Sequence, residues 1–354
     1  MNSISRISLA LLLSLPLMVS AQQTTASPTS APPPASASGE GRIQLDVMVT
    51  DKAGNPVSGL EPRDFTLLDN NQPAPVLSFH ARDGVIHKAI PPVEVILLID
   101  TVNFPAQQVG FTRIEVEKFL RLNGGHLAHP TSIFFLTNNG LDLQPKPSSD
   151  GNALAERVEN SEVRLRTIGN AAGQIGEAER FQLSTRMLTD LARNEAKKPG
   201  RKLLIWAGSG WPMLNVHNLS LSSANQQQLF TSIVELSTLL REARIDLYSI
   251  SPGMMGKGTY EYLDFLKGIK SAEKANPPSL ALRVLTVQSG GRVVGPNNDL
   301  AGQIENCVAD ADAFYTLSFD PSPAHQANEY HALKVQVAKP GLTARTNTGY
   351  YNQP

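Results

Sequence analysis

The sequence has 354 residues, and its 31 basic and 32 acidic side chains give a formal net charge of −1. This balance argues against nucleic acid or an anionic membrane surface as a partner. The only cysteine, Cys307, excludes an internal disulfide framework. The fold must therefore be stabilised by an ordinary hydrophobic core, in which Cys307 is expected to be a small buried residue. The length suffices for one large domain and a smaller one.

Residues 1–21 have the features of a secretory signal peptide. Arg6 supplies the positive charge, and residues 9–19 form an apolar run too short to span a bilayer as a stable helix. Small residues precede the expected cleavage site before Gln22, and no cysteine follows it to carry a lipid anchor. No later apolar run reaches membrane-spanning length. We therefore expect a secreted or periplasmic protein, with an uncleaved N-terminal anchor as the alternative.

The next part of the chain predicts a linker and then β structure. Residues 22–41 contain almost no large apolar side chain, which predicts a disordered Pro/Ser/Ala linker. Residues 42–90 form an N-terminal β segment, because 43–49 alternates apolar and polar residues with a period of two. Two further strands are predicted at 65–68 and 76–79, with a polar turn between them.

From 91 to 312 predicted strands and helices alternate, as in a doubly wound α/β sheet. The aliphatic run 93–99 is typical of a strand buried on both faces of a parallel sheet. Other strands are predicted at 133–136, 141–143, 203–207, 245–250 and 292–294, and helices at 108–122, 177–193, 226–243, 260–269, 280–288 and 300–312.

The last residues, 313–354, return to β structure, with strands predicted at 314–319, 333–337 and 342–351. Two or three strands on each side of the α/β domain are too few for a stable sheet. We therefore expect the two flanking β segments to build one small β-sandwich-like subdomain, from which the α/β domain emerges as an insertion.

Several segments of the chain resemble a known family. They are Asp46-Val-Met-Val-Thr-Asp-Lys-Ala-Gly-Asn-Pro-Val-Ser-Gly-Leu, Asp64-Phe-Thr-Leu-Leu-Asp-Asn, Arg201-Lys-Leu-Leu-Ile-Trp, Phe314-Tyr-Thr-Leu-Ser-Phe-Asp-Pro and Gly349-Tyr350. With these segments the chain resembles the von Willebrand factor A-related domain proteins of the acidobacterial type, over about residues 43–351. The resemblance implies an exported protein with a von Willebrand A-like, Rossmann-like α/β core and no settled biochemical role.

The resemblance also implies where a metal ion would bind. Such domains hold a divalent cation at the carboxyl edge of the sheet with Asp-x-Ser-x-Ser after the first strand, a Thr from a later loop and an Asp after the fourth strand. Hard oxygen ligands of this kind suit Mg²⁺. Here Val102 and Phe104 stand where the two hydroxyls should be, and the loop 207–211, Ala-Gly-Ser-Gly-Trp, lacks the second carboxylate. Thr167 lies in a plausible loop but cannot be aligned to the Thr.

The metal motif is therefore degenerate, and Asp100 has two interpretations. In one, Asp100, Thr101 and Asn103 recruit an optional Mg²⁺ by a variant geometry. In the other, Asp100 only hydrogen-bonds the turn that follows it. No other cofactor is expected.

The loops at the same edge are the predicted partner-binding surface. Strand ends on this side carry the Gly-rich segments 208–212 and 251–258, neither of which matches a phosphate-binding motif. The residues expected to contact a partner are Phe104, Ser209, Trp211 and Met254. Trp206, just before this edge, is either part of that surface or a core residue.

No catalytic set is visible, so the chain is predicted not to be an enzyme. Ser209 lies between glycines, but the Gly-x-Ser-x-Gly spacing of a nucleophile elbow is absent. His126 and His129 could hold Zn²⁺ only with further ligands that the sequence does not supply at a supporting spacing. They are predicted to lie at a helix end, with Gly124 terminating the helix.

These features predict an exported, non-enzymatic binding or scaffolding protein whose partners are proteins of the cell envelope or outside the cell. The alternative is a metal-ion-dependent adhesion module with a variant Mg²⁺ site. A third class, an exported hydrolase, lacks an assembled nucleophile, base and orienting residue.

Overall fold

The computed structural model describes residues 41–83, 91–144, 146–161, 173–214, 221–252 and 261–354. The predicted signal peptide, nearly all of the predicted linker, Thr167 and Met254 lie outside these residues. None of the helices in the described ranges is both long and apolar enough to cross a membrane.

The larger sheet is built mainly of parallel strands. In the described residues it has the order β10-β9-β5-β6-β7 with β8 paired to β6, and only β7 and β8 run antiparallel to their neighbour. The strands are β5 (Glu94–Asp100), β6 (His126–Thr137), β7 (Gly140–Leu143), β8 (Ser148–Asp150), β9 (Lys202–Ala207) and β10 (Ile245–Ile250). Beyond β10, Val293 makes a parallel bridge to Ser249. This strand order reverses direction between β5 and β9, as doubly wound sheets do at their switch point.

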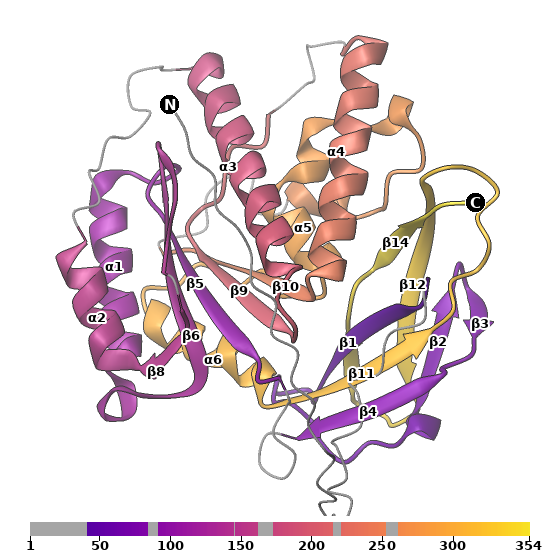
Figure 1. Ribbon diagram of the computed structural model, residues 1–354, viewed down its shortest axis with the longest axis horizontal. Helices are drawn as coiled ribbons and strands as arrows, with labels where there is room; N and C mark the ends of the chain where they lie inside the picture. The colour runs from indigo at the N-terminus through magenta and orange to yellow at the C-terminus, as the bar shows by residue number, and fades with distance from the viewer. Residues whose placement is uncertain (1–40, 84–90, 145, 162–172, 215–220, 253–260) are drawn as a thin grey trace, which may run out of the picture. The chain divides into compact units, whose positions relative to one another are not determined.

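Strand β5 is buried on both faces because all of its inner residues are apolar. Val95 and Leu97 pack in the core on one face, whereas Ile96 and Leu98 pack in the core on the other face. Helices α1 (Ala106–Leu120), α2 (Gly151–Asn160) and α6 (Leu300–Val308) contribute to the first core. Helices α3 (Gln174–Glu195), α4 (Ser223–Glu242) and α5 (Leu282–Gln288) cover the second (Figure 1). The predicted doubly wound, mainly parallel α/β sheet is confirmed.

Two antiparallel four-stranded sheets form the rest of the described chain. One has the order β13-β1-β11-β4 and the other β14-β12-β2-β3. Their strands are β1 (Ile43–Thr50), β2 (Phe65–Asp69), β3 (Gln72–Ala74), β4 (Ser78–Asp83), β11 (Ala313–Phe319), β12 (Glu329–Val337), β13 (Thr343–Arg345) and β14 (Gly349–Asn352). Residues of both sheets, such as Leu45 and Val335, share one hydrophobic core. The predicted β-sandwich from both chain ends is therefore present, with the α/β part between β4 and β11 in the sequence (Figure 1).

One ion pair connects the sandwich to the amino end of β10, and a second, buried ion pair lies within the α/β part. Arg244, just before β10, donates two hydrogen bonds of 2.9 and 2.7 Å to Asp46 of β1. Arg201, before β9, donates to Asp246 at 2.6 Å and to the Asp310 carbonyl at 2.6 Å. Burial would raise the pKa of Asp46, but the charges of Arg244 and Arg201 and the hydrogen bonds from Arg244 and Thr316 together outweigh it, so the pKa is lowered.

Some predicted elements differ from the structure. A helical segment ends here as predicted, since the 3₁₀ turn Leu122–Gly125 contains Gly124 at φ 70° and stops just before His126, but His126 and His129 themselves lie in β6. β6 tolerates Pro130 because its pairing with β8 is irregular there. The helix predicted at 260–269 is only a 3₁₀ turn, Glu261–Phe265, in the described residues. Close by, Gly268 lies against the ring of Tyr330, at a place where a Cβ would not fit. The last predicted strand, 342–351, is split into β13 and β14, and helix α2 was not predicted.

Candidate functional site

The candidate site lies where the strand order reverses, at the carboxyl ends of β5 and β9. Asp100 is the last residue of β5, and Gly208 directly follows β9. Ligands of open α/β sheets bind in the crevice that forms at such a switch point. The loops after these two strands therefore decide what the site can do.

The carboxylate of Asp100 is fully buried and surrounded by donors. Its Oδ1 accepts hydrogen bonds from the backbone N of Val102 at 3.0 Å and of Asn103 at 2.9 Å. Its Oδ2 accepts from Nε1 of Trp206 at 2.9 Å and from Nδ2 of Asn103 at 2.9 Å. Burial raises the pKa of Asp100, and the hydrogen bonds from Asn103 and Trp206 partly oppose that rise. Asp100 thus makes the contacts to the following turn that the second interpretation expects.

Thr101 and Asn103, the other two residues predicted as metal ligands, also make internal hydrogen bonds. Oγ1 of Thr101 donates to the carbonyl of Leu136 at 2.6 Å. Nδ2 of Asn103 donates to Oγ of Ser184, a buried residue of α3, at 3.1 Å. Oδ1 of Asn103 is buried and has no hydrogen-bond partner among the described residues. Among the side-chain atoms of this described turn, this amide oxygen is a buried acceptor without a partner.

Gly208 occupies the position where the resemblance would lead one to expect a side chain from the fourth strand. A Cβ at Gly208 would lie 2.5 Å from Cβ of Asp100 and 3.1 Å from its Oδ2. The end of β9 can therefore pack against Asp100 only because residue 208 has no side chain. A carboxylate could not be placed here without displacing Asp100.

These residues do not fit a divalent cation. Mg²⁺ needs a near-octahedral shell of oxygen ligands at about 2.0–2.1 Å, but both oxygens of Asp100 already accept internal hydrogen bonds. Val102 and Phe104 provide no ligand atom and are 3% and 4% exposed. Within the described residues, no group of three or more His, Cys, Asp or Glu side chains is placed to hold a metal ion.

The predicted partner-binding residues are placed differently from one another. Phe104 and Trp211 are each 4% exposed, so they do not form an exposed apolar surface in this structure. Trp211 packs edge-on against Trp206 at 5.3 Å between ring centroids, and its Nε1 donates to the carbonyl of Leu280 at 3.0 Å. Of the predicted partner-binding residues that the structure describes, only Ser209 is exposed. Trp211 is buried because it completes the core beneath α3, α4 and α5.

Sequence reasoning left the role of Trp206 open, and the structure decides it. Trp206 is fully buried, and its side chain lies in the core that β9 shares with α3 and α4. Its register opposite Leu98 of β5 places the indole two residues from Asp100 along the neighbouring strand. An indole one residue before the end of an inner strand was the available signal, because a buried indole N–H usually finds an acceptor nearby.

Ser209 has no catalytic partner in the part of the chain that the structure describes. Its Oγ donates to the carbonyls of Asn103 at 3.2 Å and Gly210 at 3.3 Å. Of the two histidines considered as Zn²⁺ ligands, His129 pairs with an acidic side chain, since its Nε2 lies 2.8 Å from Oδ1 of Asp312. The absence of enzymatic activity stays a prediction.

Comparison with solved structures finds similar chains at low sequence identity. They include the manganese-loaded TRAP protein of Plasmodium vivax (10% identity, TM-score 0.35, covering 80% of this chain and 97% of that one) and the human COPII-coat protein Sec24c (8%, 0.34, 78% and 44%). A third is the pilus adhesin SpaC of Lactobacillus rhamnosus GG (10%, 0.34, 83% and 43%). This chain spans less than half the length of the coat protein and of the adhesin. No protein-family model matches the sequence, and a comparison with curated proteins finds no match. The α/β fold is assigned from its strand order.

Proposed function

We propose that this chain is an exported, non-enzymatic protein-binding module with a von Willebrand A-like α/β core, and that it binds its partner at the carboxyl edge of that core without a metal ion. One observation carries the proposal. The acidic residue that would hold a cation, Asp100, is saturated by donors from Val102, Asn103 and Trp206. It serves to hold the loop after β5 in one conformation.

The loops at this edge are held from below by buried contacts. Asp100 fixes the turn after β5, and the hydrogen bond from Trp211 to Leu280 fixes the loop after β9. Binding with loops that are already ordered loses less conformational entropy. The exposed residues above these anchors, among them Gln107 and Ser209, are therefore the expected contact points.

Site-specific photo-cross-linking tests the proposal. A benzophenone amino acid would be introduced at position 209 of the exported protein, and in a second variant at the exposed position 197 near the opposite edge. We expect a discrete cross-linked protein from the cell envelope or culture medium only with the probe at 209. Gln107→Arg should weaken this product, because a long charged side chain would enter the contact. Equal cross-linking from both positions would place the interface elsewhere.

The alternative is a metal-ion-dependent adhesion module, and the open Oδ1 of Asn103 beside Asp100 is the observation that favours it. Thermal melts with Mg²⁺, Mn²⁺ or EDTA separate the two functions. A cation at 100 times its dissociation constant stabilises the folded state by about 2.7 kcal/mol. We expect no shift in Tm. A cation-dependent rise that disappears in Asp100→Asn would support the adhesion module instead.

A further inference from the structure

The β-sandwich has an open side that is remote from the candidate site. β3 and β4 are the last strands of the two sheets, and among the described residues each pairs with a neighbour on one side only. The opposite edge strands face the α/β part, since Tyr351 of β14 packs on Phe230 of α4 and Arg345 of β13 donates to Asp310 at 2.8 Å. β3 and β4 lie on the side away from these contacts (Figure 1).

The free edge of β4 lacks a proline, a lysine and a bulge, and its charged residues, Arg82 and Asp83, lie only at its end. Edge strands are commonly kept short or interrupted by proline, lysine or a bulge, because their unpaired backbone groups can accept another strand. The neighbouring edge, β3, is three residues long and contains Pro73. β4 is six residues long, contains neither proline nor lysine, and keeps one register with β11 from Ser78 to Asp83.

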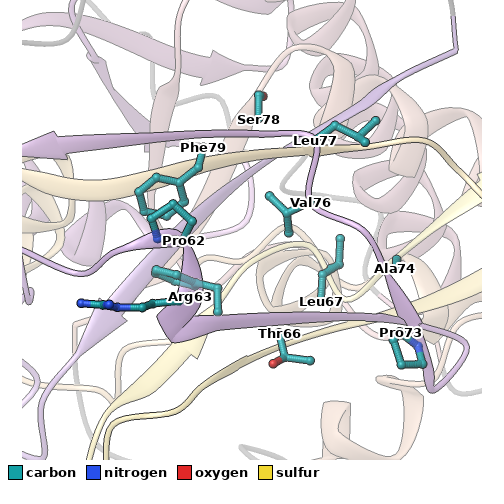
Figure 2. A pocket seen from close by; sticks show the side chains of 11 residues that line it. Pro62, Arg63, Thr66, Leu67, Pro73, Ala74, Val76, Leu77, Ser78 and Phe79 are labelled. Carbon is teal, nitrogen blue, oxygen red and sulfur yellow. The ribbon is translucent and has the colours of Figure 1, made fainter.

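A groove of about 600 Å³ runs between β3 and β4, and it opens onto the core of the sandwich. Figure 2 shows Leu67 and Val76 in its middle, with the ring of Phe79 beside Pro62 at one end. Phe79 belongs to an aromatic cluster with Phe65 and Tyr315, whose ring centroids are 5.0 to 5.7 Å apart. Leu77, which also lines the groove, is 46% exposed.

The two faces of β4 differ in chemistry. Phe79 and Ala81 are partly buried against the sandwich core, whereas Ser78, His80 and Arg82 alternate with them on the other face. Among the described residues that line the groove, Arg63 alone is charged, and its side chain is 82% exposed. An added strand would thus meet an apolar groove on one face and hydrogen-bond donors on the other.

We propose that β4 is a strand-addition site for an extended segment of a partner protein in which apolar and acidic residues alternate. The backbone of the segment pairs with the free edge of β4, its apolar side chains enter the groove between β3 and β4, and its acidic side chains face His80 and Arg82. In this mode of recognition, backbone hydrogen bonds provide affinity and pockets for alternate side chains provide specificity. The surface is separate from the carboxyl edge of the α/β sheet, so it can be tested independently of the proposed function.

The experiment is a selection of random twelve-residue peptides on the immobilised exported protein, followed by titration of one enriched peptide. We expect the enriched peptides to alternate apolar and acidic residues. Amide hydrogen exchange should slow in β4 when the peptide is bound, because backbone N–H groups at the free edge become paired. A scrambled peptide of the same composition is the control, since it keeps the charge but loses the period of two.

Variants locate the binding. His80→Glu with Arg82→Glu should weaken the peptide by about tenfold or more, because like charges then face each other. Ala74→Leu, which fills part of the groove, should weaken it while the Tm shows that the protein is folded. Lys334→Glu, on the exposed face of β12, and Ser209→Arg should leave binding unchanged. The proposal is overturned if no alternating peptide is enriched, or if binding survives both the β4 and the groove variants.

Discussion

Nε1 of Trp206 donates a 2.9 Å hydrogen bond to Oδ2 of Asp100, across the boundary between β9 and β5. Both side chains are fully buried. The bond therefore satisfies a buried carboxylate with a neutral donor from the protein itself. It makes the carboxyl edge of the sheet a fixed support for its loops.

Trp206→Phe should lower the free energy of unfolding by about 1–3 kcal/mol, because a buried acceptor then loses its donor. Urea denaturation measures the change. In a double-mutant cycle with Asp100→Asn, the cost of Trp206→Phe should shrink, since the charged acceptor is gone. Equal costs in both backgrounds would show that the bond contributes nothing to stability.

Gly208→Ala should destabilise the fold by about 1–3 kcal/mol, because a new methyl group would overlap Asp100. Gly110→Ala is the matched control. A Cβ at Gly110 of α1 has nothing within 4 Å, so alanine there should stabilise the helix by about 0.5–1 kcal/mol. Both values follow from urea denaturation. A harmless Gly208→Ala would contradict the close approach of β9 to Asp100.

Asp69 should make the sandwich sensitive to acid. Its carboxylate accepts hydrogen bonds from Tyr350 at 2.8 Å and lies 3.0 Å from Nδ1 of His331. Burial would raise the pKa of Asp69, but the hydrogen bonds from Ser322, Tyr350 and His331 outweigh it and lower the pKa below 3.8. The stability that Asp69 contributes is thus present above pH 3.8 and is lost as the pH falls through its folded pKa.

Asp69→Asn should therefore cost stability near neutral pH and progressively less as the pH falls below about 4. Urea denaturation across this pH range measures the difference from the unmodified protein. Tyr350→Phe removes one donor and should reproduce part of the pH dependence. A cost that is the same at neutral and acidic pH would exclude Asp69 as its source.

Cys307 should be unreactive in the folded protein. It is fully buried, as the sequence predicts, and burial raises the pKa of its thiol to about 12. The thiolate is the reactive form, so a thiol reagent at neutral pH should label Cys307 only after unfolding. The fraction labelled should rise along the same urea transition as the loss of secondary structure. Fast labelling without denaturant would contradict the burial of α6 against the sheet.

The sequence by itself predicts those elements whose apolar residues must be buried wherever the element lies. The continuous aliphatic run of β5 must face apolar neighbours on both sides, and helices at period 3.6 cover it. In the strands at both ends of the chain, apolar and polar residues alternate with a period of two. Too few of these strands lie before or after the α/β part to form a stable sheet alone. These constraints give the doubly wound core and the two-part sandwich.

The local sequence pattern did not predict the bounds of β6 or the presence of α2, because tertiary contacts determine both. His126 and His129 follow a glycine that ends a helical segment, but pairing with β8, which includes His126 opposite Asp150, extends β6 through them. Helix α2 begins at Gly151, where a Cβ would lie 2.1 Å from the carbonyl oxygen of Leu120. That contact joins residues far apart in the sequence, so no short window contains it.

The candidate site shows the same division. The sequence by itself shows that Val102 and Phe104 have no side-chain atom that could coordinate a cation and that no carboxylate lies in the loop 207–211 after β9. Only the tertiary structure decided how Asp100 is used and that Phe104 and Trp211 are buried. The physical reason is that hydrogen-bond saturation and burial depend on neighbouring strands and helices, which the order of residues along one loop does not specify.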